Sequence, residues 1–409
     1  MKLSPEEQAM LDGEAGTVLQ TAMAHQVKVG RFFGAADFVP VTQAHVMADT
    51  ESLGQTGVMW LEKLADANEG GVRIPTITDP RGTDFEKASL LGQADWMLEL
   101  ERRAIDAFRR LGVSMTDTCI NYQTVLAATR GEHVAFGDTG VVIYANSVCG
   151  ARSNFEGGPS ALAAGLTGRT PRYGLHLDEK RQATRRYRVT EQPRDLVDWG
   201  VLGAAVGRMA GSYWQVPVIE GLETVPTSDE IKHMGAAMAS WGSTPLFHAV
   251  GITPEAETLA DVRGQDLPVE EVSSEILGAL RSSFGARGEK LDVVVFAAPQ
   301  LSLIELQQLA GLSKDKAFRV PVYACTSPQV FPDAKRMGIV DTFEAAGGKV
   351  LVGTCFYNGF AREIREANNW TRLLSNSAKI VNILGGYGYQ PALTSMENCI
   401  ASAVAGEIV

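Results

Sequence analysis

Cysteine is scarce in this sequence and never closely paired. Among 409 residues there are five cysteines, and no two of them form a C-x-x-C pair. Zinc ribbons and ferredoxin patterns are therefore excluded, and an odd number of distant thiols argues against a disulfide framework. We expect a reducing, cytoplasmic setting in which the thiols are free or bind a metal. The cysteines are Cys119, Cys149, Cys325, Cys355 and Cys399.

Long apolar runs and an excess of basic residues are also missing. No uninterrupted apolar run reaches the roughly 18 residues that a membrane span needs. The segment Met1–Glu7 turns acidic where a signal peptide would be apolar, so we expect neither a membrane span nor a secretion signal. The net charge of -11 argues against a nucleic-acid or anionic-membrane partner. No H-E-x-x-H, G-x-S-x-G or P-loop motif occurs, which disfavours metalloproteases, esterases and nucleotidases.

The sequence does contain strand-like and helical segments in regular alternation. This alternation predicts an α/β fold with parallel sheets. The length exceeds one hydrophobic core, so we expect two or three lobes, with regions 1–210 and 211–409. A long helical stretch is predicted at 84–111 and a strand at 140–145. Later strand-like segments are 215–218, 245–250, 291–296, 320–324 and 349–352, with helices near 228–240, 269–284, 303–310 and 341–346.

The densest polar segment, 146–180, follows the predicted strand. Gly157-Gly158-Pro159-Ser160 opens a short helix, whose free N–H groups and partial positive charge suit a substrate carboxylate. Arg152 can add a two-pronged contact to the same anion. His176 has Asp178 nearby to orient its ring. The alternative interpretation is a glycine-rich connector with surface side chains.

The placement of three cysteines suggests a metal centre. Cys119 follows the predicted helix, Cys355 follows the strand at 349–352, and Cys399 opens a final helix. Ligands in open α/β sheets gather at the carboxyl ends of strands. Three thiolates can hold iron and leave one position open for a substrate. The alternative is that these are buried structural cysteines.

The stretch Ala145–Leu162 resembles the aconitase X family. Thr167–Pro171, Tyr173–His176, Gly353–Cys355 and Asn376–Lys379 continue the resemblance, which extends over essentially the whole chain. It implies an aconitase-like, multi-lobe arrangement of parallel-rich sheets flanked by helices. The swivelling fourth domain is absent from this arrangement, and the resemblance implies a separate small subunit that supplies it. The implied activity is hydro-lyase dehydration of a small hydroxy acid.

The resemblance also implies roles for particular residues. Cys119, Cys355 and Cys399 are expected to bind iron or an iron–sulfur cluster, whereas Cys149 and Cys325 are less suited. Lys379 and Ser377 are expected at the catalytic site, and the base is expected on the small subunit, as a serine. The expected substrate-binding residues are Ser147, Arg152, Asn154, Gly158, Ser160 and His176.

The resemblance leaves two substrates open. Archaeal members resemble phosphomevalonate dehydratases, and bacterial members resemble cis-3-hydroxy-L-proline dehydratases. The segment Thr116–Tyr122 (TDTCINY) departs from a Thr-Cys-Thr-Pro-Tyr-like archaeal pattern, which favours conversion of cis-3-hydroxy-L-proline to 1-pyrroline-2-carboxylate. A phosphorylated substrate needs a further basic site, for which Arg169 and Arg172 are candidates. A non-catalytic α/β assembly subunit with buried cysteines is the alternative of another class.

Overall fold

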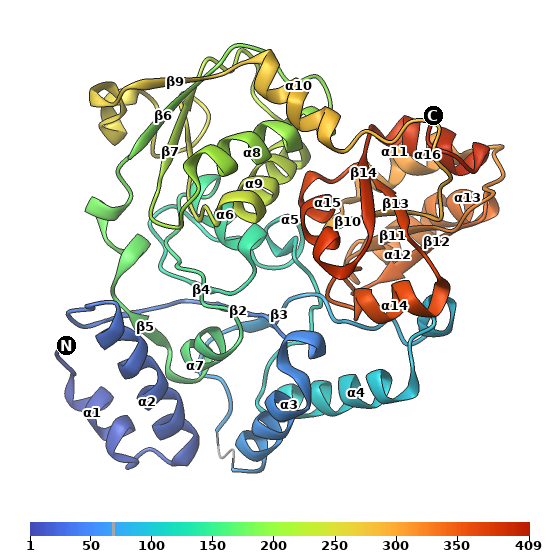
Figure 1. The fold of residues 1–409 in the computed structure, drawn as a ribbon. Coiled ribbons are helices and arrows are strands. Elements are labelled where there is room, and N and C mark those ends of the chain that lie inside the picture. The colour runs from blue at the N-terminus through green and yellow to red at the C-terminus, as the bar shows by residue number, and fades with distance from the viewer. Residues whose placement is uncertain (68–69) are drawn as a thin grey trace.

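Three parallel sheets flanked by helices meet around one centre in the computed structural model, which describes residues 1–67 and 70–409. In Figure 1 the N-terminal lobe lies at the bottom, the middle lobe at the upper left and the C-terminal lobe at the right. The predicted α/β class with parallel-rich sheets is confirmed.

The N-terminal lobe is built on a short sheet of order β3-β2-β4. Its core joins α2, α3, α4 and α7 through buried Leu61, Phe108 and Leu162. A two-stranded antiparallel pair, β1-β5, lies beside it. The bounds are α1 Pro5–Asp12, α2 Thr17–Phe32, β1 Phe38–Pro40, β2 Ala44–Val46, α3 Thr50–Asp66, β3 Thr76–Thr78, η1 Ala88–Leu91, α4 Asp95–Arg110, α5 Asn121–Thr124, β4 Ala135–Phe136, α6 Thr139–Ser147, α7 Pro159–Thr167 and β5 Arg169–Pro171.

The middle lobe has a sheet of order β8-β7-β6-β9, covered by two closely packed helices, α8 and α9. Close packing depends on glycine, because a Cβ at Gly203 of α8 would lie 2.0 Å from the Met234 carbonyl oxygen of α9. The bounds are η2 Gly174–His176, η3 Asp178–Lys180, β6 Arg185–Val189, α8 Leu196–Ala210, β7 Pro217–Glu220, α9 Ser228–Gly242, β8 His248–Ala249, η4 Leu259–Val262, η5 Gly264–Asp266, β9 Val269–Val272 and α10 Ser274–Ser283.

The C-terminal lobe is a sheet of order β12-β11-β10-β13-β14 with helices on both faces. Alternate residues of β10 face opposite layers: Val294 and Phe296 pack with α11, α13 and α16, whereas Val293 and Val295 pack with α14 and α15. The bounds are β10 Val293–Leu301, α11 Leu303–Ser313, β11 Val322–Thr326, α12 Phe331–Arg336, α13 Ile339–Ala345, β12 Gly348–Val352, α14 Ala361–Asn368, β13 Arg372–Ser375, α15 Ala378–Leu384, η6 Gly385–Tyr387, β14 Gln390–Leu393 and α16 Met396–Ala405.

In each of the three parallel sheets, strands are added first on one side of the first strand and then on its other side. The N-terminal sheet grows from β2 to β3 on one side and then to β4 on the other. The C-terminal sheet grows from β10 to β11 and β12, and then returns to β13 and β14. Ligands of open α/β sheets bind in the crevice at such switch points, outside the carboxyl ends of the strands. A ligand-binding site is therefore expected at the β2/β4 and β10/β13 switch points.

Three local predictions are wrong. The expected strand at 140–145 is helix α6, because the Asp138 side chain accepts hydrogen bonds from the N–H groups of Gly140 and Val141 and caps it. A short apolar run fits a buried helix as well as a strand. The helix expected at 84–111 is interrupted at Gly92, which has a positive φ of 70°. The helix expected at 269–284 is strand β9 followed by α10, which starts at the Ser273 cap.

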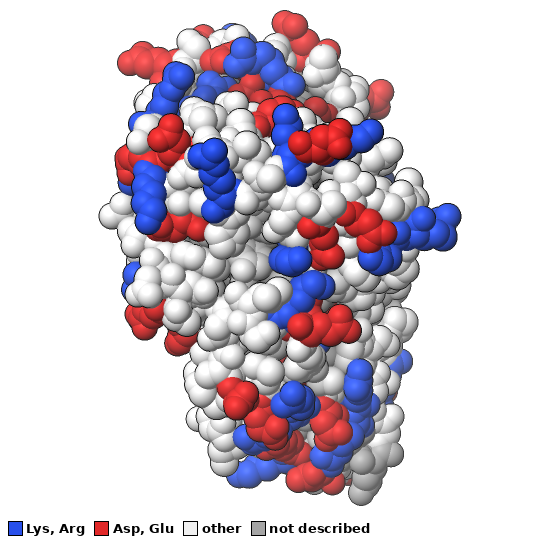
Figure 2. All heavy atoms as spheres, turned by 90° about the vertical axis from the view of Figure 1, so that its right-hand side faces the viewer, with Lys and Arg blue, Asp and Glu red and all other residues white. Residues whose placement is uncertain are grey.

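The division of the chain at residue 210 stays a prediction. Residue 210 is the last residue of α8. No helix in the described part of the chain is long and apolar enough to cross a membrane. Basic and acidic side chains are interspersed on the face drawn in Figure 2.

Gly203→Ala is expected to lower stability, because its new methyl group would overlap the α9 backbone. We expect a cost of about 1–3 kcal/mol, measured as a lower midpoint of thermal unfolding. Gly278→Ala in α10 is the matched control, since nothing lies within 4 Å of a Cβ there. It is expected to gain about 0.5–1 kcal/mol from helix propensity. Equal midpoints for the two variants would contradict the close packing of α8 and α9.

Candidate active site

Aspartates follow all three strands of the N-terminal sheet at its carboxyl edge. Asp79 follows β3 directly, Asp138 lies two residues after β4, and Asp49 lies three residues after β2. All three are almost fully buried. Because parallel strands end at the same edge, their carboxyl groups converge: the charge of Asp138 raises the pKa of Asp49 and of Asp79, and the charge of Asp49 also raises the pKa of Asp79.

The Lys379 ammonium joins this acidic edge to the C-terminal sheet. Lys379 lies in the first turn of α15, just after β13, and its Nζ is 3.4 Å from Asp138 Oδ1. The ammonium also lies 5.7 Å from the centre of the Tyr357 ring. Burial opposes its charge, but Asp138 and then the thiols of Cys119 and Cys355 raise the pKa of Lys379, so it stays protonated. The pair thus links the two switch points.

The two acids beside Lys379 have opposite protonation tendencies. Burial opposes the charge of Asp138, yet Lys379 and the backbone N–H groups of Val141 and Gly140 lower the pKa of Asp138. Asp79 is different, because burial and then the charge of Asp138 raise its pKa well above the ordinary value. A centre that holds one ionised and one neutral carboxyl group is equipped to donate a proton.

One carboxyl oxygen of Asp79 has no hydrogen-bond partner among the described residues. This oxygen, Oδ1, is buried, and it lies 3.6 Å from Nε2 of His45. That ring nitrogen is 2.9 Å from the carbonyl oxygen of Thr118, so the hydrogen bond makes Nε2 the protonated nitrogen. Burial lowers the pKa of His45, which leaves the ring neutral. An unpaired buried carboxyl oxygen is costly and indicates a contact point for a ligand.

Two of the predicted cysteines belong to this centre. Cys119 lies on the loop between α4 and α5, where the N–H of the preceding Thr118 donates to the carbonyl oxygen of Thr78 at the end of β3. Cys355 lies on the loop after β12. After burial, the charge of Cys119 is the largest influence that raises the pKa of Cys355. Burial and the charges of Asp79 and Asp138 likewise raise the pKa of Cys119. The thiol of Cys325 lies nearby, where burial raises its pKa to about 12 and Cys355 responds to its charge.

The structure does not bring Cys399 to the other two thiols. Its side chain is fully buried in the apolar core beneath the C-terminal sheet, on the face covered by α11, α13 and α16. Met396, Cys399, Ile400 and Ala403 follow helical spacing and form the packed face of α16. The three-cysteine set expected from the sequence is therefore not assembled.

A metal centre held by three thiolates does not fit the residues present. In residues 1–67 and 70–409, no group of three or more His, Cys, Asp and Glu side chains is placed to hold a metal ion. Cys119 and Cys355 offer two thiols, and the nearest charges to them include the Lys379 ammonium. Cys149 lies outside this centre and packs beside Tyr144 and Tyr122.

The predicted loop residues Arg152 and His176 lie at the opposite end of the N-terminal sheet. His133 precedes β4, and it pairs with Arg152 through a β-bridge, whereas Asp138 follows β4. His176 Nδ1 is 2.9 Å from Nδ1 of His133. Burial lowers the pKa of His176 to about 3. The guanidinium of Arg152 pairs with Asp178. These groups are thus engaged with one another.

The other predicted loop residues make structural contacts. Ser147 Oγ accepts from the backbone N–H of Phe247 at 2.9 Å, and Asn154 bonds the backbone of Tyr173 and Leu175. Ser377 caps α15 and donates to the carbonyl oxygen of Ala298 at 2.6 Å, which ties β13 to β10 beside Lys379.

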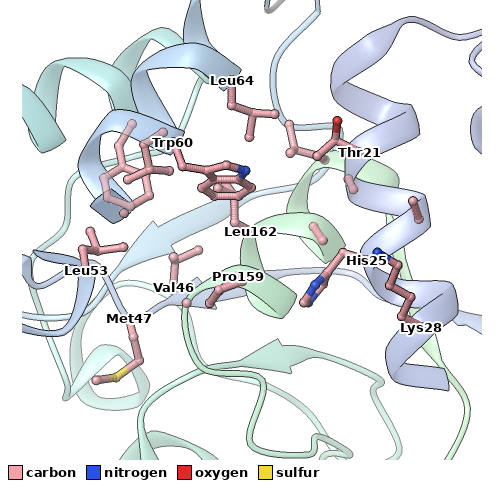
Figure 3. Close-up of a pocket in the computed structure, with 18 of the residues that line it drawn as sticks. Thr21, His25, Lys28, Val46, Met47, Leu53, Trp60, Leu64, Pro159 and Leu162 are labelled. Carbon is pink, nitrogen blue, oxygen red and sulfur yellow. The ribbon is translucent and has the colours of Figure 1, made fainter. Parts of the chain in front are cut away.

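A large apolar cavity lies beside the predicted helix start rather than at the charged centre. Gly158 lines the cavity, which has a volume of about 930 Å³ between α2, α3 and α7. Figure 3 shows Trp60 above Leu162, with His25 projecting from α2. Ser160 Oγ is 2.8 Å from Nε2 of His25. None of the described aspartates or thiols of the centre lines this cavity.

The sequence carries a signal for the aspartates that matches no standard catalytic motif. In Thr76-Ile77-Thr78-Asp79 and Ala135-Phe136-Gly137-Asp138, an acid follows a short buried strand within two residues. These strands are too short to be distinctive by periodicity alone. The buried acids were detectable by their position after each strand.

Models of three aconitase X domains match successive parts of this chain. The first domain matches residues 1–179, the second 183–277 and the third 291–405. The chain belongs to the aconitase X family. A crystal structure of Thermococcus kodakaraensis aconitase X in its holo-form superposes with a TM-score of 0.89 at 31% identity, covering 98% of this chain and 100% of that one.

Curated aconitase X relatives carry two names. The phosphomevalonate dehydratase large subunit of Methanothermobacter thermautotrophicus is 36% identical over 86% of this chain and 87% of its own length. That of Thermococcus kodakarensis is 32% identical over 98% and 100%. The cis-3-hydroxy-L-proline dehydratase of Pseudomonas aeruginosa is 30% identical over 99% of this chain and 70% of its own length. The chain is accordingly a hydro-lyase.

A second buried charge cluster supports the centre from the middle lobe. Lys232 of α9 is fully buried and pairs with Glu305 of α11 and with Asp229, whose carboxylate is 2.9 Å away. His233 Nε2 lies 2.7 Å from Glu305. Burial opposes the charge of Glu305, but the Lys232 charge and the His233 hydrogen bond lower its pKa to about 2. The cluster thereby ties α9 to α11.

In Glu305→Gln the free energy of unfolding is expected to change less than in wild type as the pH falls below about 4.5. The lowered pKa of Glu305 adds stability above its ordinary value of 4.5, and this stability is lost as the pH falls toward 2. Thermal unfolding midpoints should therefore converge for wild type and variant at low pH and differ at pH 7. The variant is expected to lose about 3 kcal/mol at pH 7, because only Asp229 then offsets the buried charge of Lys232. The exposed Glu14→Gln is the control and should follow wild type throughout.

Proposed function

We propose that this chain is the large subunit of a dehydratase that converts cis-3-hydroxy-L-proline to 1-pyrroline-2-carboxylate. The observation that carries the proposal is the buried Lys379 ammonium beside the neutral, unpartnered Asp79, between two switch points. A small partner subunit completes the enzyme, in keeping with the relatives that are named large subunits.

Lys379 holds the substrate carboxylate in this proposal. An ammonium kept charged in a buried crevice attracts a carboxylate more strongly than one in water. Asp138 fixes its position and keeps it protonated, and the hydrogen bonds from Gly140 and Val141 keep Asp138 ionised. The carboxylate contact orients the substrate for reaction.

Asp79 supplies the proton for the leaving group. A base removes the Cα proton, and the electron pair of that C–H bond forms the Cα=C3 double bond. The C3–O bond breaks, and the Asp79 carboxyl proton converts the departing hydroxide into water. The enamine then tautomerises to 1-pyrroline-2-carboxylate. The base is assigned to a serine of the small subunit, as the resemblance to aconitase implies.

Cys119 and Cys355 remain the proposed thiol contacts of an iron centre. Bound iron would supply Lewis-acid polarisation of a hydroxyl group. Cys399 is left out of this proposal because its thiol lies in the core of the C-terminal lobe.

Phosphomevalonate is the second candidate substrate. It is favoured by relatives of that name that are 31–36% identical and match nearly their full length. The two candidate phosphate contacts, however, are already paired with carboxylates. Arg169 pairs with Glu6 and Glu7, and Arg172 pairs with Asp37.

The experiment that decides between the two substrates is a turnover assay. The chain is co-expressed with its small partner under anaerobic conditions, and each substrate is tested separately. We expect 1-pyrroline-2-carboxylate from cis-3-hydroxy-L-proline, and a much lower kcat/KM for phosphomevalonate. Faster turnover of phosphomevalonate would overturn the substrate assignment and leave the hydro-lyase class intact.

Lys379→Met is expected to lower kcat/KM by about 10²–10³-fold, because it removes a preorganised charge from the reacting centre. The double variant Lys379→Met/Asp138→Asn removes both buried charges, so it should fold even where the single variant is unstable. It should remain inactive. Cys399→Ser is the control that should keep wild-type turnover. A double variant that folds and keeps wild-type kcat/KM would contradict the role of Lys379.

A further inference from the structure

Gln300 is a fully buried glutamine at the carboxyl end of β10, between the two thiols of the centre. Its backbone N–H donates to Sγ of Cys119 at 3.4 Å, and its side-chain Oε1 accepts from the backbone N–H of Cys119 at 3.3 Å. One residue of the C-terminal sheet therefore holds Cys119 of the N-terminal lobe at two points.

The amide nitrogen of the same side chain reaches two loops and the end of strand β11. Nε2 of Gln300 lies 3.1 Å from the carbonyl oxygen of Asp117 and 3.3 Å from that of Thr354. It also lies 3.3 Å from the carbonyl oxygen of Thr326. Thr354 is the residue before Cys355. The side chain thus connects the Cys119 loop directly to the Cys355 loop across the lobe boundary.

The backbone of Gln300 is itself anchored from the middle lobe. The ammonium of Lys232 donates to the Gln300 carbonyl oxygen at 3.4 Å, and this ammonium also pairs with Glu305. Ser302, two residues along, caps α11 and donates to Asp229 at 2.7 Å. All three lobes therefore converge on this residue. Its position cannot change without breaking bonds in each of them.

We propose that Gln300 is a positioning residue that sets the relative placement of the Cys119 and Cys355 thiols. Its relevance to turnover rests on the proposed function, but the placement itself does not. Gln300 acts through the two loops and does not contact the substrate. A misplacement of about 1 Å at a reacting centre costs on the order of 10²-fold in rate.

The test compares Gln300→Leu with Gln329→Leu in the full chain. Gln329 is the matched control, because it also joins the two lobes by donating to the carbonyl oxygen of Thr116 at 3.0 Å, on the Cys119 loop, but it has no hydrogen bond to Cys119 itself or to the Cys355 loop. Gln300→Glu is a third variant that keeps the shape of the side chain. It replaces the amide donor by oxygen, which faces three carbonyl oxygens.

The direct measurement is the joining of Cys119 to Cys355 by dibromobimane at alkaline pH, followed by digestion and peptide mass spectrometry. Wild type and Gln329→Leu are expected to give the Cys119–Cys355 bridged peptide. Gln300→Leu and Gln300→Glu should give at least about tenfold less of it, because the second thiol no longer lies where an intramolecular reaction is favoured. Thermal unfolding shows that each variant is folded.

Each outcome decides the proposal. Bridging by Gln300→Leu at the wild-type level would overturn it. A wild type in which Cys119 or Cys355 is bridged only to other cysteines would also overturn it, because the two thiols would then not share a centre. A loss in Gln300→Leu that Gln300→Glu restores to the wild-type level would also overturn it, since shape rather than the amide donor would then set the placement.

Turnover separates this proposal from the proposed function. If bridging responds as expected and wild type turns over neither substrate, the positioning role stands and the proposed function fails. If wild type turns over substrate and Gln300→Leu bridges normally, the positioning role fails alone.

Discussion

The buried contact between Lys379 and Asp138 is the interaction on which the centre depends. Each charge would cost several kcal/mol to bury alone, and each side chain is only 4% exposed. The two charges come from different sheets, so their lobes must dock in one arrangement to bring them together. Lys379 is the largest influence that lowers the pKa of Asp138. Burial raises the pKa of Asp79, and the charge held at Asp138 raises it further.

The switch points explain why such different residues meet. Loops that leave β2 and β4 must diverge to opposite faces of the N-terminal sheet, and those that leave β10 and β13 do the same in the C-terminal sheet. The openings face each other, and the side chains that fill them are short acids, thiols and one lysine. Gln300 satisfies the backbone groups that these diverging loops leave unpaired.

The sequence predicted the architecture better than the site. Alternating strands and helices identified the α/β class, and the strands and helices predicted between residues 291 and 352 agree with the structure to within a few residues. The elements α14, β13, α15 and β14, which include the segment of Lys379, were not predicted. The site was predicted in part, because Lys379, Cys119 and Cys355 lie close together. Cys399 instead packs in the apolar core, and nothing in its local sequence distinguishes a packed cysteine from a metal ligand. Arg152 and His176 belong to the segment with the highest density of polar side chains, yet they lie beside the amino end of β4, whereas the aspartates lie at its carboxyl end. Which end of a strand faces the crevice is a property of the assembled sheets.

The chemistry of the centre is spread over segments that are far apart in the sequence, and no contiguous stretch carries it. Asp79, Cys119 and Asp138 come from one sheet, whereas Cys355 and Lys379 come from another, more than two hundred residues later. Either lobe moved into a different protein would therefore carry only part of the charged centre and would have no catalytic activity of its own. Divergence within such a lineage is expected to proceed by changing side chains at the facing edges, because recombination between lobes would separate the halves of the catalytic apparatus.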